Sequence, residues 1–442
     1  MSPPVNAVPN SPELPESADA VVIGGGIIGV AAAYYLAKKG HSVALVEKGR
    51  VAGEQSSRNW GWCRQQNRDE RELPLIIRSL ELWGGLHEEI GADLGFRRKG
   101  LIYVTRDPAE LAGWEAWLNM ARQYQVHSRM LSAEEAQART PGTDGGWIGG
   151  IESPTDGRGE PSMAAPALAG GALTLGVSIH QECAARGLET QGGRVSAVVT
   201  EKGTIRTSRV LCAGGAWSSM FCRRHGIDLP QAGVRSTVFA TTEAPEVTPG
   251  GLSTPEFTLR RRLDGGYTVA IRNRGVLEIT PQGLRYARNF WPMFRKQRTD
   301  GVSIRVGRSF LEGPEAVARW ALDQVSPFER TRILDPAPEP GVVVEGMAAL
   351  KKAYNGFETV KPARSWAGWI DFMPDAIPTI SPIAKLPGLV LAAGFSGHGF
   401  GIGPAAGRLA ADLVAGDAPF VDPHPFRYER LFDGTMGPVG PM

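Results

Sequence analysis

Apolar positions near the start of the chain predict a strand, a helix and a second strand in close succession. Residues 20–23 form a short apolar run that enters a row of glycines, which is typical of a buried parallel strand. Residues 27–39 carry small and apolar side chains at helical spacing, and Gly40 follows as a C-terminal cap. Residues 41–47 are predicted to form the second strand. Together these segments predict a β-α-β unit of about 30 residues.

Capping residues mark the starts of two later helices. Asp107, Pro108 and Glu110 place an N-cap, a first-turn proline and an acidic third residue in order. Ser132 and Glu135 have the spacing of a capping box. The other periodic segments predict strands at 126–131, 177–186, 194–200, 205–213 and 389–393, and helices at 161–176 and 404–415, the last after a glycine-rich loop at 394–403. Residues 234–310 alternate in polarity and predict antiparallel strands with one helix near 281–299.

Length and composition indicate a folded protein with more than one domain. The chain has 442 residues, which suggests two or three domains of about 150 residues each. Hydrophobic residues make up 42% and charged residues 21%, so the chain can bury a sizeable core. The 48 basic and 46 acidic residues give a net charge of +2, which argues against a dedicated nucleic-acid-binding protein.

One segment departs from this charge balance. Residues 256–308 contain eleven arginines and one lysine against four acidic residues, a local excess of +8. This excess is compatible with a solvated face, or with a basic surface that faces substrate or a second subunit and steers anions. A flavin-fold protein that acts on RNA through this segment is an alternative, but the charge balance of the whole chain argues against it.

Cysteine usage and the ends of the chain add two expectations. The four cysteines form no CxxC pair, which argues against a disulfide framework or a metal site and fits a cytoplasmic enzyme. No apolar run reaches the roughly 18 residues of a transmembrane helix. Residues 1–17 are rich in proline and lack the features of a secretory leader, so they are predicted to form a disordered tail, with a second tail at 417–442.

A glycine motif between the first strand and the first helix predicts a dinucleotide site. In this GxGxxG pattern Gly24 allows a tight turn, Gly26 lets the main chain approach a pyrophosphate, and Gly29 permits close packing of helix and strand. Glu47 ends the second strand, where its carboxylate can accept hydrogen bonds from a ribose. FAD and NAD share this fingerprint, so an NAD(P)-dependent dehydrogenase stays an alternative at this point.

Four separated blocks narrow the choice of cofactor. They are GGGIIG at 24–29 with Glu47 and Lys48, GEQSSRNWG at 53–61, the segment from Cys183 to Trp217 that ends in LCAGGAW, and a C-terminal block of WAG at 366–368, MPD at 373–375 and GFSGHGFG at 394–401. In sequence and order these blocks resemble the FAD-dependent glycine/D-amino-acid oxidase family, which includes sarcosine oxidases and many amine dehydrogenases. The resemblance covers most of residues 18–416.

The resemblance implies a set of FAD-binding residues. They are Gly24, Gly26, Ile27, Ile28, Gly29, Glu47, Lys48, Ser56, Ser57, Arg58, Asn59, Gly61, Trp62, Ala185, Gly214, Trp217, Gly397, His398, Gly399, Phe400 and Gly401. The last five belong to a loop that leads into a helix, whose N-terminal amides can stabilise the negative charge of a reduced flavin. His398 is predicted to add a hydrogen-bond donor there, the alternative being a histidine held by packing.

The same resemblance implies an α/β architecture, α+β overall, with two domains. A discontinuous Rossmann-like FAD-binding domain would comprise 18–90, 146–233 and 341–416, and an antiparallel-sheet substrate domain would comprise 91–145 and 234–340. The implied reaction is oxidation of a CH–NH bond of an amino acid or amine by hydride transfer to flavin N5, with hydrolysis of the resulting imine. O2 or another acceptor would reoxidise the flavin, and a homo-oligomer is compatible with this picture.

Two departures from the family bear on the substrate. Sarcosine oxidases carry a carboxylate-holding lysine where this chain has Gly401, and the arginine and proline of a G-x-R-P segment in glycine oxidases are replaced by Ile370 and Asp371. Asp371 beside a missing arginine predicts a substrate with a cationic part, such as arginine or an opine-like derivative. The alternative is that Asp371 caps a turn. No cysteine follows Cys222, which favours non-covalent FAD.

Four further residues are candidates for the substrate site. Arg64 follows the flavin-contacting segment and Arg272 lies on a predicted strand, so both are candidates to hold the substrate carboxylate. Tyr354 and Trp369 are candidates to wall the pocket. The alternatives are exposed or ion-paired arginines and aromatic side chains that pack in the core. With His398 and Asp371 these residues make up the predicted catalytic set.

Overall fold

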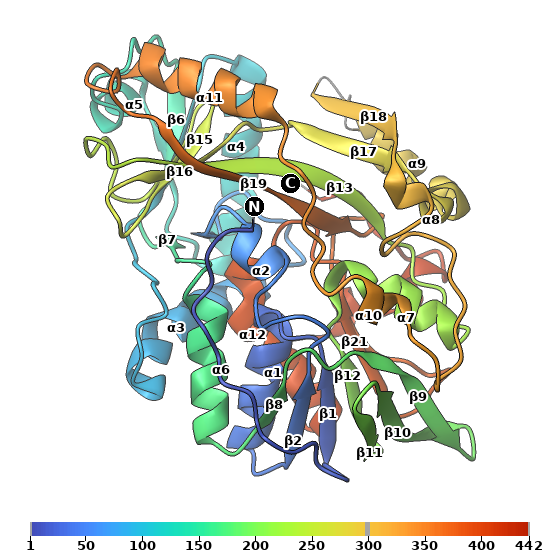
Figure 1. Cartoon of the computed structure of the whole chain (residues 1–442). Helices are drawn as coiled ribbons and strands as arrows, with labels where there is room; N and C mark the ends of the chain where they lie inside the picture. The colour runs from blue at the N-terminus through green and yellow to red at the C-terminus, as the bar shows by residue number, and fades with distance from the viewer. Residues whose placement is uncertain (1, 297–300, 441–442) are drawn as a thin grey trace.

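The computed structural model describes residues 2–296 and 301–440 and contains two main layers. A parallel sheet with helices on its face occupies the lower half of Figure 1, and a larger curved sheet lies above it. This arrangement confirms the predicted α/β class with a Rossmann-like region and a second, sheet-based region.

The six-stranded sheet has the order β20-β21-β12-β1-β2-β8 and is parallel except for the pair β20–β21. Its strands are β1 (Ala20–Ile23), β2 (Val43–Val46), β8 (Ser178–His180), β12 (Val210–Cys212), β20 (Thr379–Pro382) and β21 (Leu389–Ala393). The helices beside it are α1 (Ile27–Lys38), α3 (Leu73–Ile90), α6 (Ala164–Thr174) and α12 (Gly399–Ala415). A Cβ added at Gly407 of α12 would lie 2.4 Å from Ala31 Cβ of α1, so these two helices pack closely. The predicted β-α-β unit is confirmed.

The second sheet has ten strands in the order β18-β17-β13-β16-β15-β14-β4-β6-β5, with β19 also paired to β13. They are β4 (Leu101–Thr105), β5 (Arg129–Leu131), β6 (Gly149–Ser153), β13 (Ala232–Thr241), β14 (Gly251–Ser253), β15 (Thr258–Arg261), β16 (Tyr267–Ala270), β17 (Gly275–Ile279), β18 (Val302–Val306) and β19 (Pro362–Phe372). The sheet is mostly antiparallel, as predicted, but β4–β14 and β17–β18 are parallel pairs.

Smaller elements complete the described chain. Two short sheets contain β9 (Ala185–Gln191), β10 (Arg194–Thr200) and β11 (Gly203–Arg206), and β3 (Trp62–Cys63) with β7 (Gly157–Arg158). The other helices are α2 (Gln55–Arg58), α4 (Pro108–Ala121), α5 (Ala133–Arg139), α7 (Ser218–Arg224), α8 (Pro281–Arg285), α9 (Ala287–Lys296), α10 (Pro327–Arg330) and α11 (Pro340–Ala353). Short 3-10 helices cover Arg122–Tyr124, Gly215–Trp217, Arg308–Phe310, His424–Phe426 and Glu429–Leu431.

Capping residues in the sequence correctly predicted where several of these helices begin. The side chain of Asp107 accepts a hydrogen bond from Ala109 N at the start of α4, and Ser132 forms the expected capping box of α5. The helix predicted near 281–299 is split into α8 and α9, and residues 297–299 of that prediction lie outside the described residues. Helix α12 begins at Gly399 rather than at residue 404, because the loop glycines already have helical geometry.

The division of the chain between the two sheets differs from the predicted domain boundaries. Strands β6 and β19, which we expected in the FAD-binding domain, are part of the ten-stranded sheet. Helix α11 packs on the outer face of that sheet, and Phe328 of α10 joins the hydrophobic cluster under the parallel sheet. The cause is the long antiparallel pairing of β13 with β19, which no local pattern reveals.

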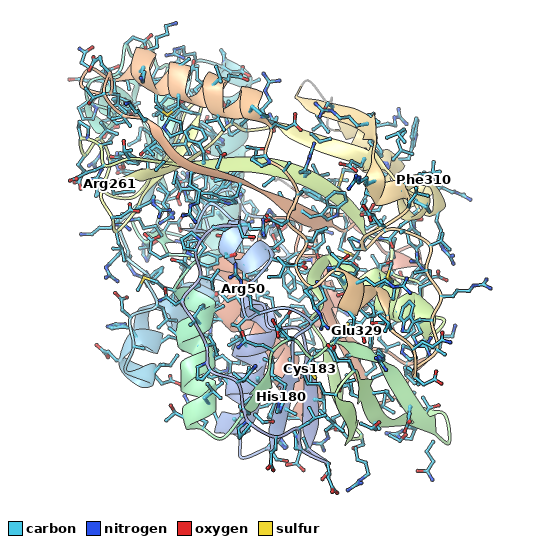
Figure 2. The ribbon with its side chains drawn as sticks, viewed as in Figure 1. Arg50, His180, Cys183, Arg261, Phe310 and Glu329 are labelled. Carbon is cyan, nitrogen blue, oxygen red and sulfur yellow. The ribbon has the colours of Figure 1, made fainter. Side chains whose placement is uncertain are left out.

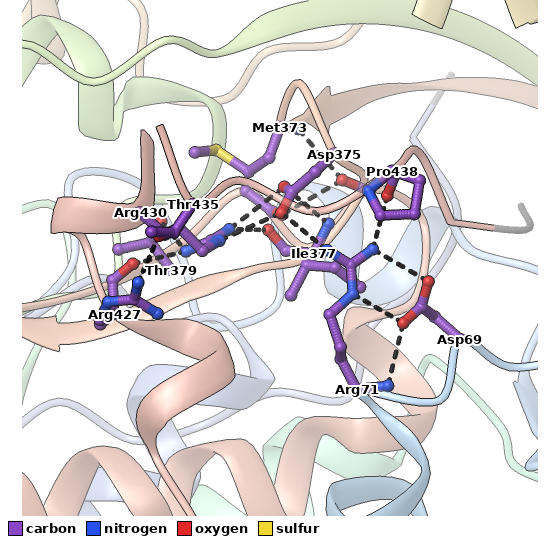
Figure 3. A network of polar contacts seen from close by, with 12 residues as sticks. Asp69, Arg71, Met373, Asp375, Ile377, Thr379, Arg427, Arg430, Thr435 and Pro438 are labelled. Atoms are coloured by element: carbon purple, nitrogen blue, oxygen red, sulfur yellow. Dashed lines mark hydrogen bonds and ion pairs between the residues drawn. The ribbon is translucent and has the colours of Figure 1, made fainter. Parts of the chain in front are cut away.

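Both predicted tails lie against the folded chain. Asn6 N donates to Ser162 O at 3.0 Å and Ser11 N donates to Ile179 O at 2.8 Å. At the other end Arg430 is buried and ion-paired with Asp375 at 3.1 Å, in the network that Figure 3 shows with Arg71. The expectation of disorder was wrong at residues 2–17, because extended, proline-rich chain can satisfy its remaining main-chain groups on neighbouring elements.

Candidate active site

A cavity with about 800 Å³ of empty space opens at the carboxyl ends of the central parallel strands. It is lined by residues that follow β1, β2 and β12, among them Gly24, Gly26, Glu47, Lys48, Arg50, Gln55, Ser56, Ala185, Gly214 and Trp217. Arg50 is labelled near the middle of Figure 2, between the two layers. In open α/β sheets ligands bind at this edge.

The three motif positions are occupied by glycine for different structural reasons. A Cβ added at Gly24, where φ is +111°, would lie 2.4 Å from Ala213 O, and one added at Gly29 would lie 2.0 Å from Gly24 O. The fold itself therefore requires glycine at both positions. A Cβ added at Gly26 would meet only Ser56 Oγ, at 3.1 Å. Gly26 thus leaves space at the cavity wall that a bound group can use.

Glu47 is fixed at the edge of the cavity by main-chain donors. Its two carboxylate oxygens accept hydrogen bonds from Gly25 N and Gly49 N, each at 2.7 Å. Desolvation raises the pKa of Glu47, while the ammonium of Lys48 and these amides oppose the shift. Each oxygen retains a lone pair for a ligand hydroxyl, as a ribose site needs.

Lys48 lines the cavity, but its ammonium already has partners. Nζ donates to Glu54 Oε1 at 2.6 Å and to the carbonyls of Thr331 and Arg332, and it lies 4.5 Å above the ring of Trp217. Lys48 therefore holds the segment that follows α10 against the cavity wall.

Of the predicted serine-containing segment, Ser56 is the residue that both lines the cavity and contacts the glycine motif. Its Oγ accepts from Ile27 N at 2.8 Å, at the start of α1. Ser57 and Asn59 bond to main-chain groups of their own turn, and Asn59 also accepts from Gly61 N. These contacts shape the turn rather than the cavity wall.

Arg58 is a structural residue rather than a cavity residue. Its buried guanidinium donates to Asp335 at 2.7 Å and to Ala367 O at 2.9 Å. It thus ties α2 to β19 and to the segment before α11. The prediction that Arg58 contacts the cofactor finds no support in these contacts.

Asp371 holds the glycine loop and does not face an open pocket. Its Oδ2 accepts from Gly394 N at 2.9 Å and from Gln231 Nε2 at 3.1 Å, and its main-chain oxygen accepts from Ser396 N. Burial raises the pKa of Asp371 to about 6. The predicted charge contact with substrate finds no support in these contacts: the carboxylate positions the loop before α12, as the turn-capping alternative proposed.

His398, at the start of α12, forms a buried pair with Glu72. Nδ1 lies 2.8 Å from Glu72 Oε2. Burial and the nearby Arg68 guanidinium lower the pKa of His398 to about 4, and the pKa of Glu72 is also lowered. Since ionised Glu72 can only accept, Nδ1 carries the proton and Nε2 presents a lone pair. His398 therefore offers an acceptor at Nε2, where we predicted a donor.

The glycines that begin α12 allow close contact with β3. A Cβ added at Gly401 would lie 3.1 Å from Trp62 O and 3.3 Å from Cys63 Cα. Gly401 O also accepts from Ser79 Oγ and Trp83 Nε1. Any side chain at this position would require these main-chain atoms of β3 to move by a few tenths of an ångström.

Three arginines lie within electrostatic reach of a buried aromatic wall next to β3. The rings of Trp62 and Tyr103 are 5.9 Å apart, and those of Tyr103 and Trp114 are 5.8 Å apart. Burial raises the pKa of Tyr103, and the positive charges that oppose this shift belong to Arg64, Arg68 and Arg272. The structure thus brings the two predicted arginines to one place.

The three guanidinium groups differ in their burial and in the hydrogen-bond partners that they already have. Arg64 is buried and donates to the carbonyls of Gln66 and Asn67. Arg68 donates to Arg64 O at 3.2 Å, and burial lowers its pKa to about 9. Arg272 is 29% exposed and donates from Nη1 to Glu110 at 2.7 Å. Our sequence reasoning missed Arg68, although its four-residue spacing from Arg64 was a visible signal.

Tyr103 and Trp114 were also missed from the sequence. They lie on β4 and α4, far along the chain from Arg272, and only the pairing of β4 with β14 brings them close to it. Both lie among the apolar positions of β4 and α4, which marks them as buried but does not distinguish a pocket wall from a core.

Tyr354 and Trp369 do not join this group. Tyr354 packs with Phe257 and Phe357 beneath α11, on the outer face of the ten-stranded sheet. On β19 the indole of Trp369 lies over Gly233, where an added Cβ would be 1.7 Å from Nε1. Its neighbour Ile370 points to the opposite face of the strand, as alternation requires. Packing accounts for the two side chains, and their predicted roles as pocket walls find no support in these contacts.

Comparisons with known proteins identify the family. A family model described as FAD dependent oxidoreductase, DAO, matches residues 19–413. The chain belongs to this family. The solved structure of L-amino acid deaminase from Proteus myxofaciens, in complex with anthranilate, is 32% identical with a TM-score of 0.92 and covers 97% of each chain. Sarcosine oxidase subunit beta from Arthrobacter is 26% identical, and the match covers 96% of this chain and 94% of the oxidase subunit. Glycine oxidase from Pseudomonas aeruginosa is 27% identical, and the match covers 92% of this chain and 97% of the glycine oxidase.

Membership of the DAO family makes this protein an FAD-dependent oxidoreductase and disfavours the NAD(P) and RNA alternatives. The cavity fits the adenine end and diphosphate of FAD. Gly26 leaves space for the pyrophosphate at the N-terminus of α1, Glu47 can accept from ribose hydroxyls, and Ala185 and Trp217 line the same cavity. Within residues 2–296 and 301–440, no cluster of potential metal ligands occurs and no helix is long and apolar enough to cross a membrane.

Proposed function

We propose that this protein oxidises the α-carbon–nitrogen bond of an L-amino acid, with FAD as the hydride acceptor. The observation that carries the proposal is the group of Arg64, Arg68 and Arg272 around Tyr103, because a buried aromatic wall with several cationic groups suits a carboxylate-bearing substrate. The similarity to the L-amino acid deaminase from Proteus myxofaciens supports the L configuration and a primary amine.

We assign the substrate carboxylate to Arg272. The guanidinium of Arg64 is buried and donates to main-chain carbonyls, so it serves its own loop. Arg272 is partly exposed, has a single acidic partner among the residues that the structure describes, and keeps further N–H groups for a ligand. Two parallel hydrogen bonds from a guanidinium fix both the position and the orientation of a carboxylate.

The remaining residues complete the environment of the reaction. When bound, FAD would supply the acceptor for the hydride of the substrate α-carbon. Trp62, Tyr103 and Trp114 form an apolar wall that excludes water from the reacting carbon. His398 Nε2 is a buried acceptor at the start of α12. Loss of the hydride and the amine proton yields an imino acid, and water converts it to a 2-oxo acid and ammonia.

The proposal does not include a preference for basic amino acids, because that preference depended on Asp371, whose carboxylate bonds to Gly394 and Gln231. It does include a non-covalent cofactor. The four cysteines are buried at residues 63, 183, 212 and 222, outside the glycine loop. Acid precipitation should therefore release the flavin into the supernatant, and colour that stays in the pellet would contradict this part.

A panel of substrates tests the proposal. L-, D- and N-methyl amino acids are supplied to the holoenzyme with O2 and, in parallel, with an artificial electron acceptor. We expect 2-oxo acid and ammonia from L-amino acids, and we expect Arg272→Gln to raise KM. Preferred release of methylamine from N-methyl substrates, or preferred use of D-amino acids, would overturn the assigned substrate class.

A further inference from the structure

Arg272 already binds a carboxylate that belongs to the protein. Its Nη1 donates to Glu110 Oε1 at 2.7 Å, and the two side chains are 29% and 26% exposed. Glu110 lies in the first turn of α4, the helix that also carries Trp114 of the aromatic wall. An internal acid therefore occupies part of the guanidinium that the substrate must engage.

This ion pair leaves most of the guanidinium unused. Glu110 contacts one nitrogen, and Nε of Arg272 is buried without a hydrogen-bond partner among the described residues. A guanidinium and a carboxylate pair best through two parallel hydrogen bonds. A substrate carboxylate that makes two such bonds therefore holds Arg272 better than Glu110 does.

Glu110 can leave Arg272 without becoming an isolated buried charge. Its side chain is partly exposed and can be hydrated. It also lies near the N-terminus of α4, where the free main-chain N–H groups and the helix dipole favour a carboxylate. Replacement of Glu110 by a ligand carboxylate at Arg272 therefore needs only the movement of one side chain and costs little free energy.

We propose that Glu110 competes with the substrate carboxylate for Arg272 and so sets how tightly the site binds carboxylate ligands. The inference rests on the proposed function, since it takes Arg272 as the carboxylate holder. A ligand with a carboxylate displaces Glu110, whereas a simple amine leaves the Arg272–Glu110 pair closed. The pair thereby lowers the affinity of the site for carboxylate ligands, and a simple amine, which does not engage Arg272, is unaffected by it.

The first test measures binding of anthranilate to the oxidised holoenzyme from the change in the visible flavin spectrum. Glu110→Gln removes the competing charge, and we expect the Kd to fall about two- to fivefold, the range for a partly exposed ion pair. The matched control is Glu345→Gln, which removes the exposed partner of Arg274 at 2.8 Å. The control should leave the Kd unchanged.

The second test repeats Glu110→Gln in an Arg272→Gln background, where the gain in affinity should disappear because the competed group is gone. In steady state, Glu110→Gln should lower KM for amino acids and leave the low activity on simple amines unaltered. An unchanged or higher Kd in Glu110→Gln, or the same gain without Arg272, overturns the inference while the proposed function stands. A holoenzyme that neither binds anthranilate nor oxidises any amino acid overturns both.

Discussion

Replacement of Gly26 by alanine should remove FAD while the apoprotein stays folded. The main chain at Gly26 has φ −73° and ψ 172°, which alanine adopts without strain. The added Cβ would meet Ser56 Oγ at 3.1 Å, and a hydroxyl can rotate aside. The methyl group would, however, occupy the space in which a pyrophosphate approaches the N-terminus of α1.

The expected loss of affinity follows from the hydrogen bonds that the phosphate would lose. A hydrogen bond to a charged group contributes about 1.5–3 kcal/mol. Displacement of the pyrophosphate from two main-chain amides would then cost about 3–6 kcal/mol, which raises the Kd for FAD by about 10²- to 10⁴-fold. The variant should therefore purify largely without flavin.

Two further glycines serve as controls. Gly85 of α3 has open space around its added Cβ, so Gly85→Ala should keep both FAD and stability. Gly29→Ala places a Cβ 2.0 Å from Gly24 O and should lower the free energy of unfolding of the apoprotein. The readouts are FAD content, FAD titration of the apoprotein and Tm. A Gly26→Ala protein that binds FAD with the wild-type Kd, or an apoprotein that melts as early as Gly29→Ala, would refute the reasoning.

Three other substitutions probe buried groups outside the cofactor turn. Glu315 accepts a hydrogen bond from Thr280 Oγ1 at 2.6 Å, and burial raises its pKa to about 7. Because folding disfavours the ionised form of Glu315, Glu315→Gln should raise the free energy of unfolding by up to about 3 kcal/mol at about pH 8 and leave it unchanged near pH 4.5. Thermal melts that show an equal gain at both pH values would contradict this cause. Tyr354→Phe removes a buried hydroxyl that has no partner among the described residues, so Tm should stay the same or rise with kcat/KM unaltered, and a large loss of kcat/KM would return Tyr354 to the site. Asp371→Asn should leave the ratio of kcat/KM for L-arginine and L-leucine within about twofold, and a shift toward L-leucine would revive a charge contact with substrate.

The glycine turn was predictable from sequence because its causes are local. Gly29 and Glu47 act on neighbours within one β-α-β unit, and the strand, the helix and the acid all have short-range signals. Of these contacts, only that of Gly24 with Ala213, after β12, is long-range. The capped starts of α4 and α5 were predictable for the same reason.

The substrate side of the site could not be predicted in the same way, because it depends on strand pairings between residues far apart in the chain. On β19 a shift of one residue changes the face of the sheet, so Ile370 points toward Gly397 while Trp369 and Asp371 point away. Which face is which depends on the pairing of β19 with β13, more than a hundred residues earlier. The sequence shows the alternation but not the pairing partner, so it did not show which face of the sheet carries Trp369 and Asp371.

The protonation state of His398 could not be predicted from the sequence for a different reason. The glycine loop located it at the start of a helix, but its protonation depends on Glu72 and Arg68, which come from the N-terminal end of α3 and the loop before it. Only the three-dimensional arrangement shows that Nδ1 is occupied and that Nε2 is left as an acceptor.

The most direct test of the account is anaerobic reduction of the bound flavin in a single turnover. The purified holoenzyme is mixed with an L-amino acid without any electron acceptor, and the visible absorbance of oxidised FAD and the 2-oxo acid formed are measured together. We predict full bleaching with one 2-oxo acid per FAD, and a rate at low substrate concentration that falls in Arg272→Gln. A holoenzyme whose flavin is reduced by dithionite but by no L-amino acid would contradict the central claim.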